Sequence, residues 1–157
     1  MSTGEQQEPT LEECSANVLM EVSNTMVRLY KDHFGRGPTS ARTHWAGSDA
    51  LVCILEDTFT PAERNLARMG AHDRLRDTRL FFQYATVAKL GAPVEHITGR
   101  KLKGFHSSID TETHGQAVEL LLLHPAGYDG PSRLELAGRR SALPSAGTLR
   151  PCRSTWA

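Results

Sequence analysis

The stretch KLKGFHSSIDTETHGQAVELLLLH, residues 101–124, decides the fold. Two segments, 101–109 and 116–124, flank the polar loop 110–115, which is the pattern of a β-hairpin. Within the second segment, Val118 to Leu123 form an almost continuous apolar run. Runs of this kind are typical of strands in the interior of a sheet. We therefore expect a hairpin whose second strand is central and buried.

A second hairpin is predicted upstream. Ala41, Thr43 and Trp45 alternate with polar residues, the period-2 pattern of a half-buried strand. A Gly-Ser-Asp turn signal follows at 47–49, and the apolar run 51–55 then supplies a partner strand.

An amphipathic helix is predicted before the hairpins, from Thr10 to Phe34. Its apolar positions recur at helical spacings of four, four and three, at Val18, Val22, Met26 and Leu29. Gly35 ends this helix and Pro38 prevents its restart.

A second helical region begins at TPAE, residues 60–63, where Thr60 and Glu63 form a capping box and Pro61 suits the first helical position. It extends to about Leu90. The apolar phase slips near Gly70, which predicts a bend or break there. We expect a further interruption at 91–93 by Gly91 and Pro93, then a last helical turn or two that ends at Gly99.

The predicted order is α-β-β-α-α-β-β, an α+β fold of two layers with a four-stranded antiparallel sheet and helices on one face. Three parts of the chain are distinguished: a frayed N-terminus at 1–10, a domain at 11–124, and a disordered Arg/Gly/Pro-rich tail at 125–157.

Five motifs occur in order along this domain. They are MVRLYKDHFGRGP (26–38), FTPAE (59–63), Arg79 in RDTRLFF, ITG (97–99), and FHSSIDTETHGQAVELLL (105–122). On these motifs residues 11–124 resemble the small bacterial MpsC-like family, named for the C subunit of a sodium-translocating, membrane-potential-generating system. The resemblance implies a non-enzymatic accessory or interaction protein of the cytoplasm, working with a membrane cation (Na⁺) or bicarbonate system, peripherally at the inner membrane face. It implies no catalytic residue, cofactor or metal. The family-motif positions taken as binding candidates are Gly35, Arg36, Gly37, Pro38, Arg79 and Asp110.

Each candidate also has a structural explanation. The FGRGP motif at 34–38 presents backbone N–H groups and a guanidinium to an anion, or it is only a helix stop and turn. Arg79 pairs with Asp77, Glu56 or Asp110, or faces a carboxylate of a partner. In both cases we favour the structural interpretation, a helix stop for the motif and an ion pair within the chain for Arg79.

No catalytic or metal signature is found. The seven histidines show no HxH or HExxH spacing and the three cysteines no CxxC pair. His106 and His114 flank one hairpin and are the best metal pair. An enzyme requires convergence of Arg79, His106 and Asp110, the arrangement that a structure tests.

The chain has 157 residues with 18 basic and 18 acidic side chains, so its formal net charge is zero. This argues against nucleic-acid binding by bulk electrostatics. The charge is unevenly distributed. Residues 60–103 hold nine bases and four acids, whereas residues 1–38 hold three bases and six acids. The basic helices and tail therefore leave an alternative open, a module that binds an anionic ligand or nucleic acid. A protein partner is expected, and homodimer formation through an exposed sheet edge stays open. Purely apolar runs such as 51–55 and 120–123 are far too short to span a membrane.

Overall fold

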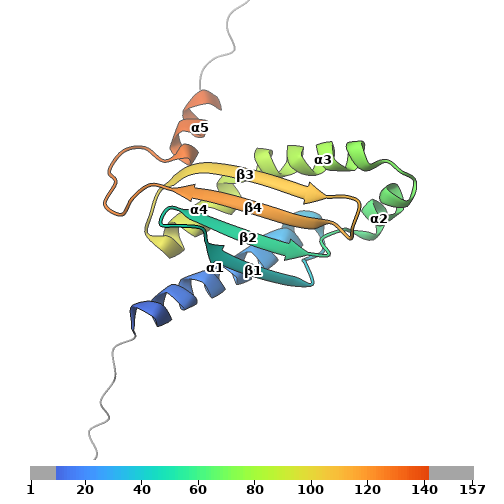
Figure 1. Cartoon of the computed structure of the whole chain (residues 1–157). Coiled ribbons are helices and arrows are strands. Elements are labelled where there is room, and N and C mark those ends of the chain that lie inside the picture. The colour runs from blue at the N-terminus through green and yellow to red at the C-terminus, as the bar shows by residue number, and fades with distance from the viewer. Residues whose placement is uncertain (1–9, 142–157) are drawn as a thin grey trace, which may run out of the picture.

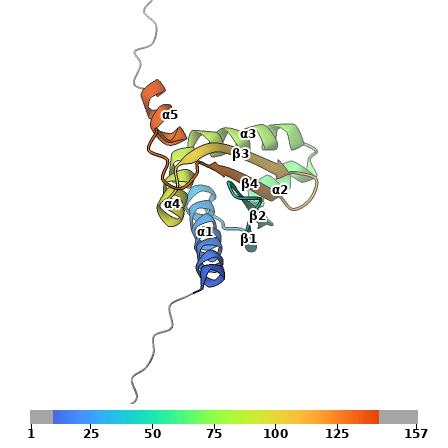
Figure 2. The ribbon, with the colours of Figure 1, turned by 60° about the vertical axis from the view of Figure 1, so that its left-hand side comes forward.

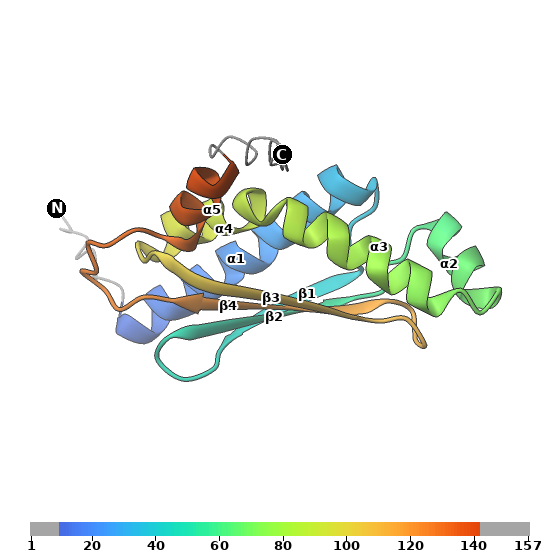
Figure 3. The same ribbon diagram turned by 90° about the horizontal axis from the view of Figure 1, so that it is seen from above.

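A computed structural model describes residues 10–141, and the predicted fold is confirmed. One four-stranded antiparallel sheet, in the order β1-β2-β4-β3, carries all of the described helices on one face (Figures 1 and 3). The elements are α1 (Leu11–Phe34), β1 (Ser40–Trp45), β2 (Ala50–Glu56), α2 (Pro61–Arg68), α3 (His72–Ala85), α4 (Val87–Thr98), β3 (Leu102–Asp110), β4 (Gln116–Leu123) and α5 (Arg133–Ser141).

Helix α1 begins and ends as its sequence predicts. Thr10 accepts a hydrogen bond from the Glu13 backbone while the Glu13 carboxylate accepts one from the Thr10 backbone, so a capping box starts the helix. Gly35 ends it in the left-handed conformation, at φ 74°. The buried side of α1 presents Val22, Met26 and Tyr30 to the sheet.

The second helical region is divided into three helices, α2 to α4. Thr60 caps α2 through the predicted box with Glu63, and the predicted break falls at Gly70, with φ 75°. The expected interruption at 91–93 is wrong, because both residues lie within α4 and the second break falls at Thr86. Gly91 is needed for packing rather than for a break, since a Cβ there would lie 3.0 Å from the Leu102 side chain and 3.1 Å from Leu134.

The tail is more ordered than predicted. The expectation that residues 125–157 are disordered is wrong for the segment that forms α5, which packs beside α4 (Figure 2). Leu134 contacts the core, and Lys101 forms an ion pair of 3.4 Å with Glu135. One apolar contact in a short helix leaves no periodic pattern to detect. Residues 142–157 and 1–9, the rest of the tail and most of the frayed N-terminus, lie outside the described residues.

The two faces of the sheet differ. Helix-facing positions of the central strands are fully buried, among them Leu51, Leu55 and Leu121. On the opposite face, positions of the same two strands are only half-buried: Val52, Ile54, Val118, Leu120 and Leu122. The prediction of a central strand at 118–123 is confirmed by the strand order.

The hairpin loop depends on Gly115. Its φ of 77° suits glycine, and a Cβ there would lie 2.7 Å from Cε1 of the buried Phe59 ring. Its carbonyl also accepts hydrogen bonds from the Thr58 backbone (3.2 Å) and hydroxyl (2.7 Å).

Gly115→Ala is therefore expected to destabilise the fold by roughly 3 kcal/mol, through left-handed strain and overpacking together. Gly127→Ala is the matched control, because Gly127 has φ 80° but open space around it, and should cost only about 1 kcal/mol. Urea unfolding measures both values. Equal losses would contradict the role given to Phe59.

Candidate functional site

The FGRGP motif forms an internal clamp. Arg36 Nη1 donates to the backbone carbonyls of Asp57 and Phe59, and Nη2 donates to Asp57 Oδ2 at 2.7 Å. Arg64 binds the other Asp57 oxygen at 2.9 Å. The hydrogen bond from Arg36 is the main reason that the pKa of Asp57 lies below its usual value. The guanidinium therefore holds the end of α1 to the β2–α2 loop.

The glycines around Arg36 also have local structural roles. Gly35 ends α1, and Gly37 lies against that helix, where a Cβ would be 3.3 Å from the carbonyl oxygen of Val27. Pro38 follows them before β1 begins. An anion-binding role for these positions stays a prediction.

Among the described residues, Arg79 is the largest fully buried side chain, with 1% of its surface exposed. Its partner is Glu63, to which Nε donates at 2.5 Å and Nη2 at 2.6 Å, while Nη2 also donates to the Thr58 carbonyl at 2.8 Å. The guanidinium lies 3.9 Å from the centre of the Phe34 ring. The partners expected from the sequence were wrong.

Glu63 is thus bound twice, by Thr60 at the start of α2 and by Arg79 of α3. Burial raises the pKa of its carboxyl, but the hydrogen bonds from Arg79 and Thr60 outweigh burial and hold the pKa below its usual value. Glu63 is therefore an ionised structural group rather than a free base.

A second buried polar cluster joins α1, α3 and β4, and the sequence analysis missed it. Tyr30 donates its hydroxyl hydrogen to Glu119 Oε1 at 2.5 Å. The amide of Gln83 donates to both, at 2.7 Å to the Tyr30 hydroxyl and 2.8 Å to Glu119 Oε1. All three side chains are at most 1% exposed. The available signal was an acidic residue at a helix-facing position inside the apolar run AVELLLL.

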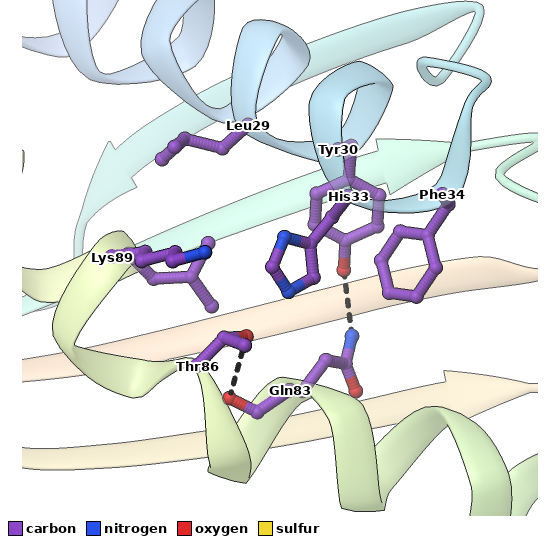
Figure 4. Close-up of a pocket in the computed structure, with 8 residues that line it drawn as sticks. Leu29, Tyr30, His33, Phe34, Gln83, Thr86 and Lys89 are labelled. Carbon is purple, nitrogen blue, oxygen red and sulfur yellow. Dashed lines mark hydrogen bonds between the residues drawn. The ribbon is translucent and has the colours of Figure 1, made fainter.

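Burial raises the pKa of Glu119 from 4.5 to about 7. Its second oxygen, Oε2, has no hydrogen-bond partner among residues 10–141, and neither has Gln83 Oε1. A small cavity of about 10 Å³ adjoins the cluster (Figure 4) and is lined in part by Tyr30, His33, Phe34 and Gln83. That volume suits roughly one water molecule and no organic substrate.

A larger surface cleft of about 360 Å³ lies between α2 and the β3–β4 loop. Arg64, Arg68, His72 and His114 line it, with Glu112 as its acidic member. Its size falls within the range of small-molecule sites. The basic side chains of this cleft suit an anion.

The arrangement proposed for an enzyme does not form. Arg79 is buried in the helix layer, whereas His106 and Asp110 are exposed on β3. Asp110 instead shapes its own loop, since its carboxylate accepts bonds from the Glu112 backbone (2.9 Å) and the Thr113 hydroxyl (3.2 Å). Across residues 10–141, no three His, Cys, Asp or Glu side chains are grouped as metal ligands.

The structure so far defines a class: a two-layer α+β domain whose buried ionic and polar groups join its helices to its sheet. Residues 16–123 match the family described as "Na+-translocating membrane potential-generating system (MpsC)", and the chain belongs to that family. A curated relative, "Uncharacterized protein YbcI" of Bacillus subtilis (strain 168), is 26% identical over 116 residues, which cover 72% of this chain and 90% of the relative. No solved structure is significantly similar. In the part of the chain that the structure describes, every helix is too short or too polar to cross a membrane.

Glu119 should make the stability of the fold depend on pH. A raised pKa means that the folded state binds the proton more tightly than the unfolded state, so stability falls as pH rises from about 4.5 through 7. The full difference is about 3 kcal/mol, and it persists at higher pH. Glu119→Gln keeps an acceptor for Tyr30 and Gln83 but cannot ionise.

We expect the free energy of unfolding of Glu119→Gln to rise relative to that of the wild type as pH increases across this window. Urea unfolding from pH 4 to 8 measures both values. The difference between the two curves isolates Glu119 from Asp57 and Glu63, whose lowered pKa values act in the acid range. A constant difference over all pH values would contradict an ionisable Glu119.

Proposed function

We propose that this chain is a non-enzymatic accessory protein of the cytoplasm that docks on a protein component of a Na⁺-translocating membrane system. The family description supports the association with such a system. The single observation that carries a docking role is the exposed aromatic surface of α3.

That surface contains two adjacent phenylalanines. Phe81 is 69% exposed and Phe82 47%, and their ring centres lie 5.9 Å apart, edge to face. Arg74 and Thr78 continue the same exposed side at helical spacing. Exposed aromatic side chains next to an arginine are typical of protein-binding anchors.

Charge indicates the chemistry of the partner. Residues 60–103, which include α2 to α4, carry nine bases against four acids. We therefore infer a partner surface with an apolar pocket and an acidic surround. Complementary charge raises association rate and selectivity more than affinity.

The buried polar groups support binding over catalysis. Arg79 and Glu63 neutralise each other, Arg36 holds the half-buried Asp57, and the cavity beside Tyr30 and Gln83 is the size of a water molecule. Each of these groups joins secondary-structure elements, whereas the α3 aromatics make the helix surface apolar without filling the core.

The test is affinity purification of the full chain from membranes solubilised in mild detergent, with mass spectrometry of what is bound. We expect subunits of a cation-translocating complex, and Phe81→Ser with Phe82→Ser should reduce their recovery by roughly tenfold or more. Leu136→Ser is the matched control, because Leu136 is 47% exposed on α5, and it should retain them. Failure to recover such subunits, or equal recovery by both variants, would overturn the proposal.

A second candidate is specifically favoured by the basic cleft beside α2. Its two arginines and two histidines suit a small phosphate-bearing anion. Calorimetry with pyrophosphate at low salt should then show binding that weakens steeply as salt rises. Arg68→Gln should weaken it about tenfold while Arg74→Gln, on the outer side of α3, should not. Absence of binding at low salt would remove this candidate.

A further inference from the structure

The face of the sheet opposite the helices forms a regular grid. Strand pairing aligns Ala50 with Leu122, Val52 with Leu120, and Ile54 with Val118. These six side chains point away from the helices, since the intervening positions of β2 and β4 fill the core. They form an aliphatic strip two strands wide, which we call the open-face strip. Figure 3 shows that no described element lies beneath it.

Polar side chains border the open-face strip on both edge strands. On β1, His44 is aligned with Val52 and Arg42 with Ile54. On β3, His106 is aligned with Leu120 and Ser108 with Val118. An aliphatic centre with a polar rim is the composition of a protein interface.

The apolar composition of the open-face strip is unusual for a surface that faces solvent. Antiparallel strands with one solvated face alternate apolar and polar residues, as β1 does, whereas β2 and β4 are apolar on both faces. Strands of the latter kind normally have a layer on each side. One of those layers is missing from the single described chain.

We infer that a second copy of this chain supplies the missing layer, with the two sheets stacked face to face about a two-fold axis parallel to the strands and midway between β2 and β4. This axis places β2 of one copy over β4 of the other. Each residue of β2 then lies over the residue of β4 with which it is aligned within its own sheet. Val52 then lies over Leu120 of the second copy, and Ile54 over Val118. The aliphatic strips of the two copies cover each other completely.

The same axis brings the polar edge strands of the two copies together at the rim. It brings β1 over β3 of the second copy, so that Arg42 meets Ser108 and lies one row from Asp110. A two-fold axis perpendicular to the strands through the Val52 row would instead place each strand over itself, so that His44 would lie over His44 of the second copy. Arg42 retains its own Glu56 within the chain at 3.0 Å and has donors left for a carboxylate across the interface.

The size of the face predicts a weak dimer. Four strands about 4.8 Å apart and six residues at about 3.3 Å each give roughly 400 Å² of footprint per copy. Stable complexes bury about 800 Å² on each side. Association should therefore depend on concentration in the micromolar range. It is independent of the proposed function, because the α3 aromatics lie in the layer on the other side of the sheet.

Sedimentation velocity of the full chain from about 1 µM to 1 mM tests this inference. The expected result is a monomer–dimer equilibrium, which Leu120→Lys weakens at least tenfold because it buries a charge in the strip. Leu66→Lys, the same change at a residue of α2 that is 40% exposed, should leave the equilibrium unchanged. If Leu120→Lys fails to fold by circular dichroism, Val52→Thr replaces it, with weaker association again expected.

Crosslinking tests the axis. In a Cys14→Ser, Cys152→Ser background, His44→Cys with His106→Cys should give a covalent dimer with a thiol crosslinker of about 10 Å, the spacing of stacked sheets. Within one chain the two positions lie on opposite edges of the sheet, about 14 Å apart. Neither single variant should crosslink.

A chain that stays monomeric at 1 mM would overturn the inference and leave the strip to residues 142–157 or to another protein. Crosslinking by a single variant, or dissociation by Leu66→Lys as well, would overturn the stated arrangement.

Discussion

The buried ion pair of Arg79 and Glu63 is the contact on which the helix layer depends. Arg79 comes from α3, Glu63 from the first turn of α2, and the third partner, the Thr58 carbonyl, from the loop after β2. Phe34, at the end of α1, covers the guanidinium. Four segments therefore meet at one cation, and removing that cation would leave a carboxylate and a carbonyl without their partner. Breaking a buried pair costs several kcal/mol even where forming it gains little.

Local signals made most of the fold predictable. Capping boxes, left-handed glycines and alternating strands act over three or four residues, so the ends of α1, the start of α2 and both hairpins could be predicted from the sequence. The misplaced break in α4 shows the limit of such signals. Its sequence neighbourhood alone marks Gly91 as a helix breaker. In the fold, however, a glycine is needed there because Leu102 and Leu134 of other elements pack against it.

The candidate site was less predictable, because its partners are far apart in the chain. Glu63 lies 16 residues from Arg79, and Tyr30 lies 89 residues from Glu119. A periodic pattern shows that a residue faces the core but not which side chain it meets there. Arg79 was identified as a candidate from its motif, whereas Glu119 lies within a strand whose other residues fit the apolar pattern. Only the tertiary fold brings these groups together.

The interior and the surfaces of the molecule have different roles. Arg79 is neutralised by Glu63, and no cation bonds to Glu119 among the described residues, so burial favours its protonated form. The ionic charges of the described core are thus close to balanced, although Arg79 Nη1, Gln83 Oε1 and Glu119 Oε2 have no hydrogen-bond partner there. The apolar features of the described surface include the exposed aromatics on α3 and the half-buried aliphatics across β2 and β4. These surfaces are on opposite sides of the sheet, so a face-to-face dimer would display two copies of the helix layer outward, each open to a partner.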